Sequence, residues 1–244
     1  MTYCMGMLLR DGLVMVSDSL TNAGVDQIAK FRKMTVWEQP GERTIVLLTA
    51  GNLAISQSTV NLLNEGWEGH NGQTILTVPS MTEAARLVGA AIREVEHTDG
   101  PALRAHKLEF DVTMILGGQI HGGPVRLFLI YAAGNFIEST PDTPFFQIGE
   151  NKYGKPILDR VIKFDTSLPD AAKCSLISMD STLRSNISVG PPVDLLVYHR
   201  DALKVKVHES LVDSDPYFNE LRKAWSNGLR QVFADIRNPP WDFS

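Results

Sequence analysis

The sequence predicts an α+β fold, because its strand and helix patterns come in separate blocks rather than in strict alternation. Short apolar runs typical of strands fill the first fifty residues and return near the middle and towards the end, with helical periodicity between them. The chain has 244 residues, of which 43% are hydrophobic and 21% are charged, so it can bury a sizeable core. This length fits one large domain or two small ones.

Composition also restricts the partners and the compartment. The net charge of −5 argues against nucleic acid or an anionic membrane as partner, because either would favour a basic face. No apolar run approaches the length of a membrane span, and the N-terminus lacks the pattern of a signal peptide. The two cysteines, Cys4 and Cys174, form no disulfide framework, and Cys4 alternates with apolar neighbours. We therefore expect a cytoplasmic protein with Cys4 in its core.

The first element is predicted to be a β-hairpin. Residues 3–9 and 13–17 are short apolar runs, and the Asp-Gly pair between them is the strongest short-range hairpin signal. With that pair as a two-residue loop, Asp18 would lie opposite Met5. Three residues, about 10 Å of strand, would then separate Asp18 from Thr2.

Thr2 is a candidate nucleophile, because removal of Met1 would leave a free α-amine beside its hydroxyl. Such an amine, with an unperturbed pKa of roughly 7.7–8.0, can act as the base that a Thr hydroxyl needs. Lys33 has the reach to mediate between Asp18 and Thr2, and its charge would favour the deprotonated form of nearby groups. The basic cluster that contains Lys33, together with Lys30 and Arg32, also fits a solvated edge.

The remaining elements follow in order from apolar periodicity and from turn residues. Gly100-Pro101 is expected to end the second helix, and Thr82 to cap it. Strands are predicted at 30–36, 43–50, 110–116, 126–131, 136–139, 145–148, 193–198 and 202–207, and helices at 52–65, 81–97, 153–163, 167–182 and 215–232.

Gly51 ends a predicted strand at the start of a helix, where backbone N–H groups are unpaired and point outward. Preorganised donors of this kind can stabilise an oxyanion. An ordinary strand-to-helix junction would have the same sequence pattern. Thr49 and Leu53 would flank a small apolar pocket beside it.

Two further observations concern metals and the C-terminus. The six histidines share no motif with metal-ligand spacing, so we expect neither a metal nor a cofactor. The tail carries two aromatic residues, Trp241 and Phe243, and is expected either to be disordered or to dock on a neighbouring subunit.

The N-terminal Thr, the Ser17-Asp18-Ser19 strand end, Lys33 and the run 48–51 resemble the proteasome β-subunit family of N-terminal-nucleophile hydrolases. Three longer segments are similar to its bacterial Anbu branch. They are Asp18–Gly24, Gly149–Arg160 and Ser178–Pro192.

The resemblance implies a four-layer αββα sandwich formed by residues 1–244 as one domain. Residues 235–244 are the extension for which contact with a neighbour is the alternative to disorder. It implies a threonine-type endopeptidase that hydrolyses peptide bonds through an acyl-enzyme on Thr2. Substrates would be peptides or unfolded proteins, enclosed by a ring-like or stacked homo-oligomer. Whether an ATP-driven unfoldase feeds the assembly is left open. A small-molecule amidase and a latent scaffold are the alternatives.

The resemblance also assigns the site. Catalytic roles go to Thr2, Asp18 and Lys33, with Lys30 as the alternative amine, and the oxyanion donor is Gly51. Supporting positions are Asp180, Ser181 and Glu150. The chain departs from the family pattern at three positions: Glu150, or Asn151 with a shift, replaces a Ser, Leu183 replaces another Ser, and Met34 stands where the family has its Lys. Ser185 or Ser188 could compensate for Leu183.

Overall fold

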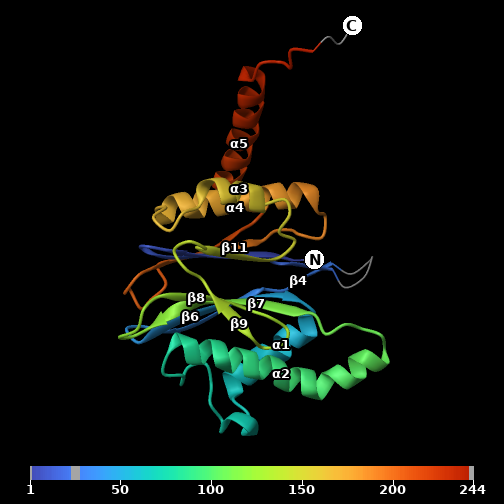
Figure 1. Cartoon of the computed structure of the whole chain (residues 1–244), viewed down its shortest axis with the longest axis vertical. Coiled ribbons are helices and arrows are strands. Elements are labelled where there is room, and N and C mark those ends of the chain that lie inside the picture. Colours follow the sequence, from blue (N-terminus) through green and yellow to red (C-terminus); the bar gives the residue numbers. More distant parts are fainter. Residues whose placement is uncertain (1, 23–27, 242–244) are drawn as a thin grey trace.

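Two five-stranded antiparallel sheets stack face to face at the centre of the molecule, and helices cover their outer faces (Figure 1). The computed structural model describes residues 2–22 and 28–241, with the side chains of 21, 22 and 28–30 left out. The layers follow the order helix, sheet, sheet, helix. The predicted α+β fold and its four-layer αββα arrangement are therefore confirmed.

The first sheet holds both strands of the N-terminal hairpin near its centre. Its strands are, in spatial order, β10 (Phe145–Gly149), β1 (Tyr3–Leu9), β2 (Gly12–Asp18), β11 (Val193–His199) and β12 (Val207–Leu211). Strands β1 and β2 are buried on both faces, which explains their continuous apolar runs.

The second sheet follows the chain order of its strands. They are β5 (Met34–Gln39), β6 (Arg43–Gly51), β7 (Val112–Ile120), β8 (Arg126–Ile130) and β9 (Phe136–Glu138). A separate two-stranded sheet pairs β3 (Leu20–Asn22) with β4 (Ile28–Lys30). In chain order this small sheet lies between β2 of the first large sheet and β5 of the second. Lys33 immediately precedes β5.

Helices form the outer layers. Helices α1 (Leu53–Glu65) and α2 (Met81–Ala105) cover the second sheet, with a 3₁₀ turn at Glu68–His70 between them. Helices α3 (Lys155–Val161) and α4 (Leu168–Ser185) cover the first sheet. Helix α5 (Pro216–Asp235) stands away from this layer (Figure 1). The predicted extension at 235–244 begins at the last residue of α5, and Phe243 lies outside the described residues.

Three apolar clusters hold the layers together. One lies between the second sheet and its helices, one between the first sheet and its helices, and the third between the two sheets. Cys4 belongs to the cluster between the sheets and is fully buried, as expected. Burial raises the pKa of its thiol well above the usual value, so Cys4 stays a neutral core residue.

Several predicted boundaries differ from the structure, and two of the differences have local reasons. Helix α2 continues through Pro101 to Ala105, because a proline removes only one ladder hydrogen bond, and Ser80 rather than Thr82 is its N-cap. Residues 202–206 of the predicted strand at 202–207 form a loop, and β12 begins only at Val207. Asp201 and Leu203 have φ angles of 62° and 45°, which a strand cannot accommodate.

No helix within residues 2–22 and 28–241 is long and apolar enough to cross a membrane.

Candidate active site

The hairpin places Asp18 directly beside the start of β1. Leu9 pairs with Gly12 and Cys4 with Ser17, so the two-residue loop is 10–11 and Asp18 falls opposite Tyr3. The predicted pairing of Asp18 with Met5 is wrong. The loop starts one residue earlier than predicted, because Gly12 belongs to β2 and not to the turn. The Tyr3 N–H donates to Asp18 Oδ1 over 3.0 Å. The carboxylate therefore lies one residue from Thr2 along the sheet.

Asp18 and Lys33 form a buried ion pair. Lys33 Nζ lies 2.7 Å from Asp18 Oδ1 and also donates to the Leu20 carbonyl over 2.7 Å, and the side chains are 6% and 0% exposed. Burial raises the pKa of Asp18 above its ordinary value of 3.8. The Lys33 charge and the N–H groups of Tyr3 and Gly190 lower it part of the way. The side chain of Lys30, the alternative amine, lies outside the described part of the structure.

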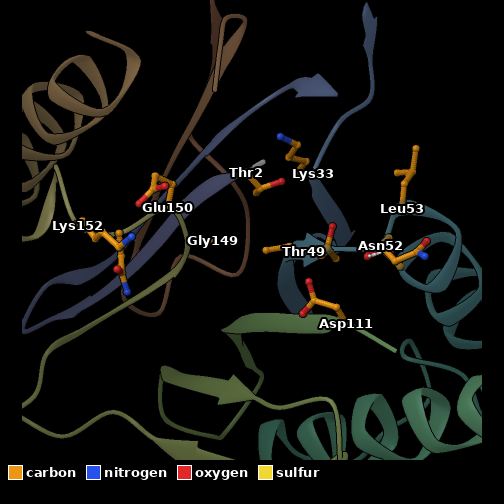
Figure 2. Close-up of a pocket in the computed structure, with 13 residues that line it drawn as sticks. Thr2, Lys33, Thr49, Asn52, Leu53, Asp111, Gly149, Glu150 and Lys152 are labelled. Atoms are coloured by element: carbon orange, nitrogen blue, oxygen red, sulfur yellow. Dashed lines mark hydrogen bonds between the residues drawn. The ribbon is translucent and has the colours of Figure 1, made fainter. Parts of the chain in front are cut away.

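Thr2 and Lys33 line one cavity of about 600 Å³ between the ends of the two sheets (Figure 2). Its walls combine small and apolar residues with charged ones, so the predicted small apolar pocket is only partly observed. The lining residues are Thr2, Lys33, Thr49, Ala50, Gly51, Asn52, Leu53, Ser56, Asp111, Gly149, Glu150, Asn151 and Lys152.

Gly51 lines the cavity at the end of its strand, β6. Hydrogen bonds alternate along an antiparallel pair, and Asn52 N–H donates to Asp111 O across β7. Regular alternation predicts that the Gly51 N–H points the other way, in the direction of Thr49 N–H, which donates to Lys33 O. Strand β5 begins only at residue 34, so it does not extend to Gly51. This geometry suits an oxyanion donor.

Gly149 and Glu150 hold the main chain of Thr2. The Glu150 N–H donates to the Thr2 carbonyl over 2.7 Å. Gly149 has a φ of 79°, and a Cβ built there would lie 1.9 Å from the same carbonyl oxygen. Only glycine allows β10 to approach Thr2 this closely.

Replacing Gly149 by Ala should therefore destabilise the protein by more than the roughly 1–2 kcal/mol that a left-handed backbone costs, because the Cβ also displaces Thr2. Gly41→Ala is the matched control, since Gly41 has a φ of 80° but its Cβ would meet nothing within 4 Å. Chemical denaturation measures the free energy of unfolding of both variants. Equal losses in the two variants would show that the Thr2 contact is not tight.

Two residues that the sequence did not point to also belong to this region. Asn186 Nδ2 donates to Glu150 Oε2 over 3.1 Å, and Gly190 N–H donates to Asp18 Oδ2 over 3.3 Å. Both lie in the short segment between α4 and β11. The Gly-Pro-Pro run at 190–192 gave a signal for a turn there, but not for its contact with Asp18.

Asp180 and Ser181 do not line the cavity. Asp180 is buried and lies 3.0 Å from both Arg184 Nε and Arg222 Nε, so it ties α4 to α5. Ser181 Oγ donates to the Ile177 carbonyl within α4. The Ser188 N–H donates to Asn186 Oδ1, the side chain that also contacts Glu150. Neither residue is among those that line the cavity, so the supporting roles given to Asp180 and Ser181 stay predictions.

Within the described part of the chain, no three His, Cys, Asp or Glu side chains are grouped as metal ligands.

Solved structures of Anbu proteins are similar to this chain along its whole length. An Anbu (Gly-1) mutant from Hyphomicrobium sp. strain MC1 is 51% identical, with a TM-score of 0.91 over 99% of this chain and 100% of that one. Anbu (ancestral β-subunit) from Yersinia bercovieri is 49% identical, with a TM-score of 0.91 over 98% and 99%.

The structure described as a helical assembly of the Anbu complex from Pseudomonas aeruginosa is 50% identical, with a TM-score of 0.93 over 99% and 100%. No protein-family model and no curated protein matches the sequence.

Proposed function

The chain belongs to the Anbu (ancestral β-subunit) family, and on that premise we propose that it is an N-terminal threonine peptidase of the proteasome type. The observation that carries this proposal is the position of Thr2. It is the second residue of the chain and lines a cavity together with Lys33, whose ammonium is paired with the buried Asp18.

Removal of Met1 would give Thr2 a free amine. That amine takes the proton from Thr2 Oγ while Oγ forms a bond to the carbonyl carbon of the substrate. The Gly51 N–H stabilises the negative charge that develops on the carbonyl oxygen. As the C–N bond breaks, the amine returns the proton to the leaving nitrogen. Water then hydrolyses the ester on Thr2 and restores the enzyme.

Lys33 and Asp18 tune this reaction without bonding to the substrate. The Lys33 ammonium lowers the free energy of negative charge on Thr2 Oγ, and Asp18 keeps the ammonium oriented. Glu150 acts in the opposite direction. A carboxylate on the cavity wall raises the pKa of a free amine at Thr2, which makes that amine a weaker base at neutral pH. We therefore expect low activity at pH 7.

We further propose that residues 1–244 act as one proteasome β-subunit-like unit that self-associates. A related chain, 50% identical and matched over 99% of this chain and 100% of its own length, is described as a helical assembly. Such an assembly would admit peptides or unfolded proteins to the Thr2 cavity and exclude folded ones.

Hydrolysis assays with fluorogenic peptides, a denatured protein and small amides test the proposal. The peptidase predicts cleavage of peptides and of the denatured protein, blocked by a β-lactone. Cleavage of small amides alone would replace it with an amidase. No cleavage at any pH between 6 and 10 would favour a latent scaffold, for which the engagement of Asp180 by two arginines is the supporting observation.

A further inference from the structure

One wall of the Thr2 cavity is formed by the end of β6, the start of α1 and the start of β7, and Asp111 is its charged residue. Asp111 immediately precedes β7, and its carbonyl accepts the Asn52 N–H over 2.8 Å. A Cβ built on Gly51 would lie 2.3 Å from the same carbonyl oxygen. The main chain of Asp111 therefore lies directly against the residue assigned as oxyanion donor.

Strand alternation directs the Asp111 side chain into the space between the two sheets. Successive side chains of a strand point to opposite faces. Val112 packs against the helices and Ile115 against the first sheet, so Asp111 shares the face of Ile115. The same rule places Thr2 on the face of Cys4, which also lies between the sheets. Thr2 and Asp111 thus enter the cavity from opposite sheets, and Figure 2 shows the Asp111 carboxylate directed into it.

The Asp111 carboxylate has no hydrogen-bond or ion-pair partner among the described residues. Glu150, the other carboxylate of the cavity lining, accepts a hydrogen bond from Asn186. Glu150 shares the opposite wall with Lys152, so that wall carries one charge of each sign. The negative charge of Asp111 is therefore uncompensated on its own wall and available to a cation of the substrate.

We propose that Asp111 is a specificity residue, which binds the arginine or lysine side chain of the residue whose carbonyl Thr2 attacks. This inference rests on the proposed peptidase, because that reaction puts the carbonyl between Thr2 Oγ and the Gly51 N–H. The side chain of the attacked residue then lies beside the end of β6. Asp111 is one strand further, at a spacing of about 4.8 Å, which a long basic side chain spans.

Charge and shape together rank the substrates. Arginine can bind a carboxylate with two parallel hydrogen bonds, whereas lysine offers a point charge. Citrulline has the shape of arginine without its charge, and glutamate is repelled. We expect kcat/KM for arginine to exceed that for citrulline by about 10- to 100-fold, the range for a hydrogen bond to a charged group. Because Asp111 is exposed to solvent, added salt should reduce this preference.

Cleavage of N-terminally blocked peptides that differ only at the attacked residue tests the preference. Asp111→Asn keeps the size of the side chain and removes its charge, so the ratio of arginine to citrulline cleavage should fall to near one. Asp111→Lys should reverse the order and favour glutamate over arginine. Glu109→Gln is the matched control, since Glu109 is exposed and outside the cavity lining, and it should keep the original ratio.

A binding measurement separates this inference from the proposed peptidase. Protein with Thr2→Ala lacks the attacking hydroxyl and leaves the peptides intact. Fluorescence anisotropy then gives the Kd of the blocked arginine and citrulline peptides. We expect at least about 10-fold tighter binding of the arginine peptide, and loss of that difference when Asp111→Asn is added.

The two proposals can fail separately. Equal cleavage of the arginine and citrulline peptides, or a preference that survives Asp111→Asn, would overturn the role of Asp111 and leave the peptidase. Absence of all cleavage, with tighter arginine binding that depends on Asp111, would overturn the peptidase and leave the cation site. Absence of both cleavage and preferential binding would overturn both. A preference seen only with unblocked peptides would place the substrate's N-terminal amine at Asp111 and overturn the side-chain assignment.

Discussion

Thr2→Ala is expected to abolish hydrolysis and β-lactone labelling while the fold and the assembly stay intact. The substitution removes the attacking oxygen and little else, because Thr2 is only part-buried and its main-chain contact with Glu150 N–H is preserved. Loss of a nucleophile lowers turnover to background, by at least ~10⁴-fold. Rates of peptide cleavage and the extent of labelling measure the effect.

Two variants control this experiment. Thr2→Ser keeps a hydroxyl beside the amine and should retain labelling. Thr49→Ala removes a second hydroxyl from the same cavity and should also retain it. Undiminished labelling of Thr2→Ala, with label on Thr49 instead, would show that the nucleophile is misassigned.

Of the substitutions predicted here, Lys33→Met is expected to cause the largest loss of stability, and it should also lower the activity. It leaves the Asp18 carboxylate buried without its counter-ion, and breaking a buried ion pair costs about 3–5 kcal/mol. Lys152→Met is the matched control, since Lys152 lines the same cavity but is exposed, and its change should stay within about 0.5 kcal/mol. Urea denaturation measures the free energy of unfolding of the Lys33→Met and Lys152→Met variants.

The pH dependence of the Lys33→Met variant has a defined sign. Burial already raises the pKa of Asp18, and loss of the Lys33 charge raises it further. The folded state then binds more protons than the unfolded state, so stability falls as the pH rises from the unfolded value of about 3.8 through the folded pKa. The variant should therefore be closest to the unmodified protein at low pH. A deficit that is constant from pH 4 to pH 8 would show that Asp18 is not the group affected.

The sequence allowed the fold class to be predicted because its strands and helices have strong local signals. The layer arrangement came from the resemblance and not from periodicity. The predicted hairpin register is wrong, because the Asp-Gly signal placed Gly12 in the two-residue loop, whereas the loop is Arg10-Asp11. The structure shows that Gly12 is needed in β2, where a Cβ would lie 1.9 Å from the Tyr198 carbonyl of β11. That contact joins residues nearly two hundred positions apart.

The candidate site also combines residues that local sequence signals identify with residues that only long-range packing brings in. Thr2, Asp18, Lys33 and Gly51 sit in or beside elements with local signals, and the structure brings them to one end of the sandwich. Asp180 was selected from a motif, but its arginine partners come from its own helix and from α5. Asn186 and Gly190 reach the site through a loop whose path depends on the packing of α4 and β11, which no local pattern encodes.

The central claim is that Thr2 becomes a reactive N-terminal residue. Its most direct test is the intact mass of the purified protein before and after incubation with an epoxyketone, which bonds to both the amine and the hydroxyl of an N-terminal Thr. We expect a mass lower by one Met residue and then a single adduct that maps to Thr2. A retained Met1 with no adduct, in protein that is folded and assembled, would contradict it.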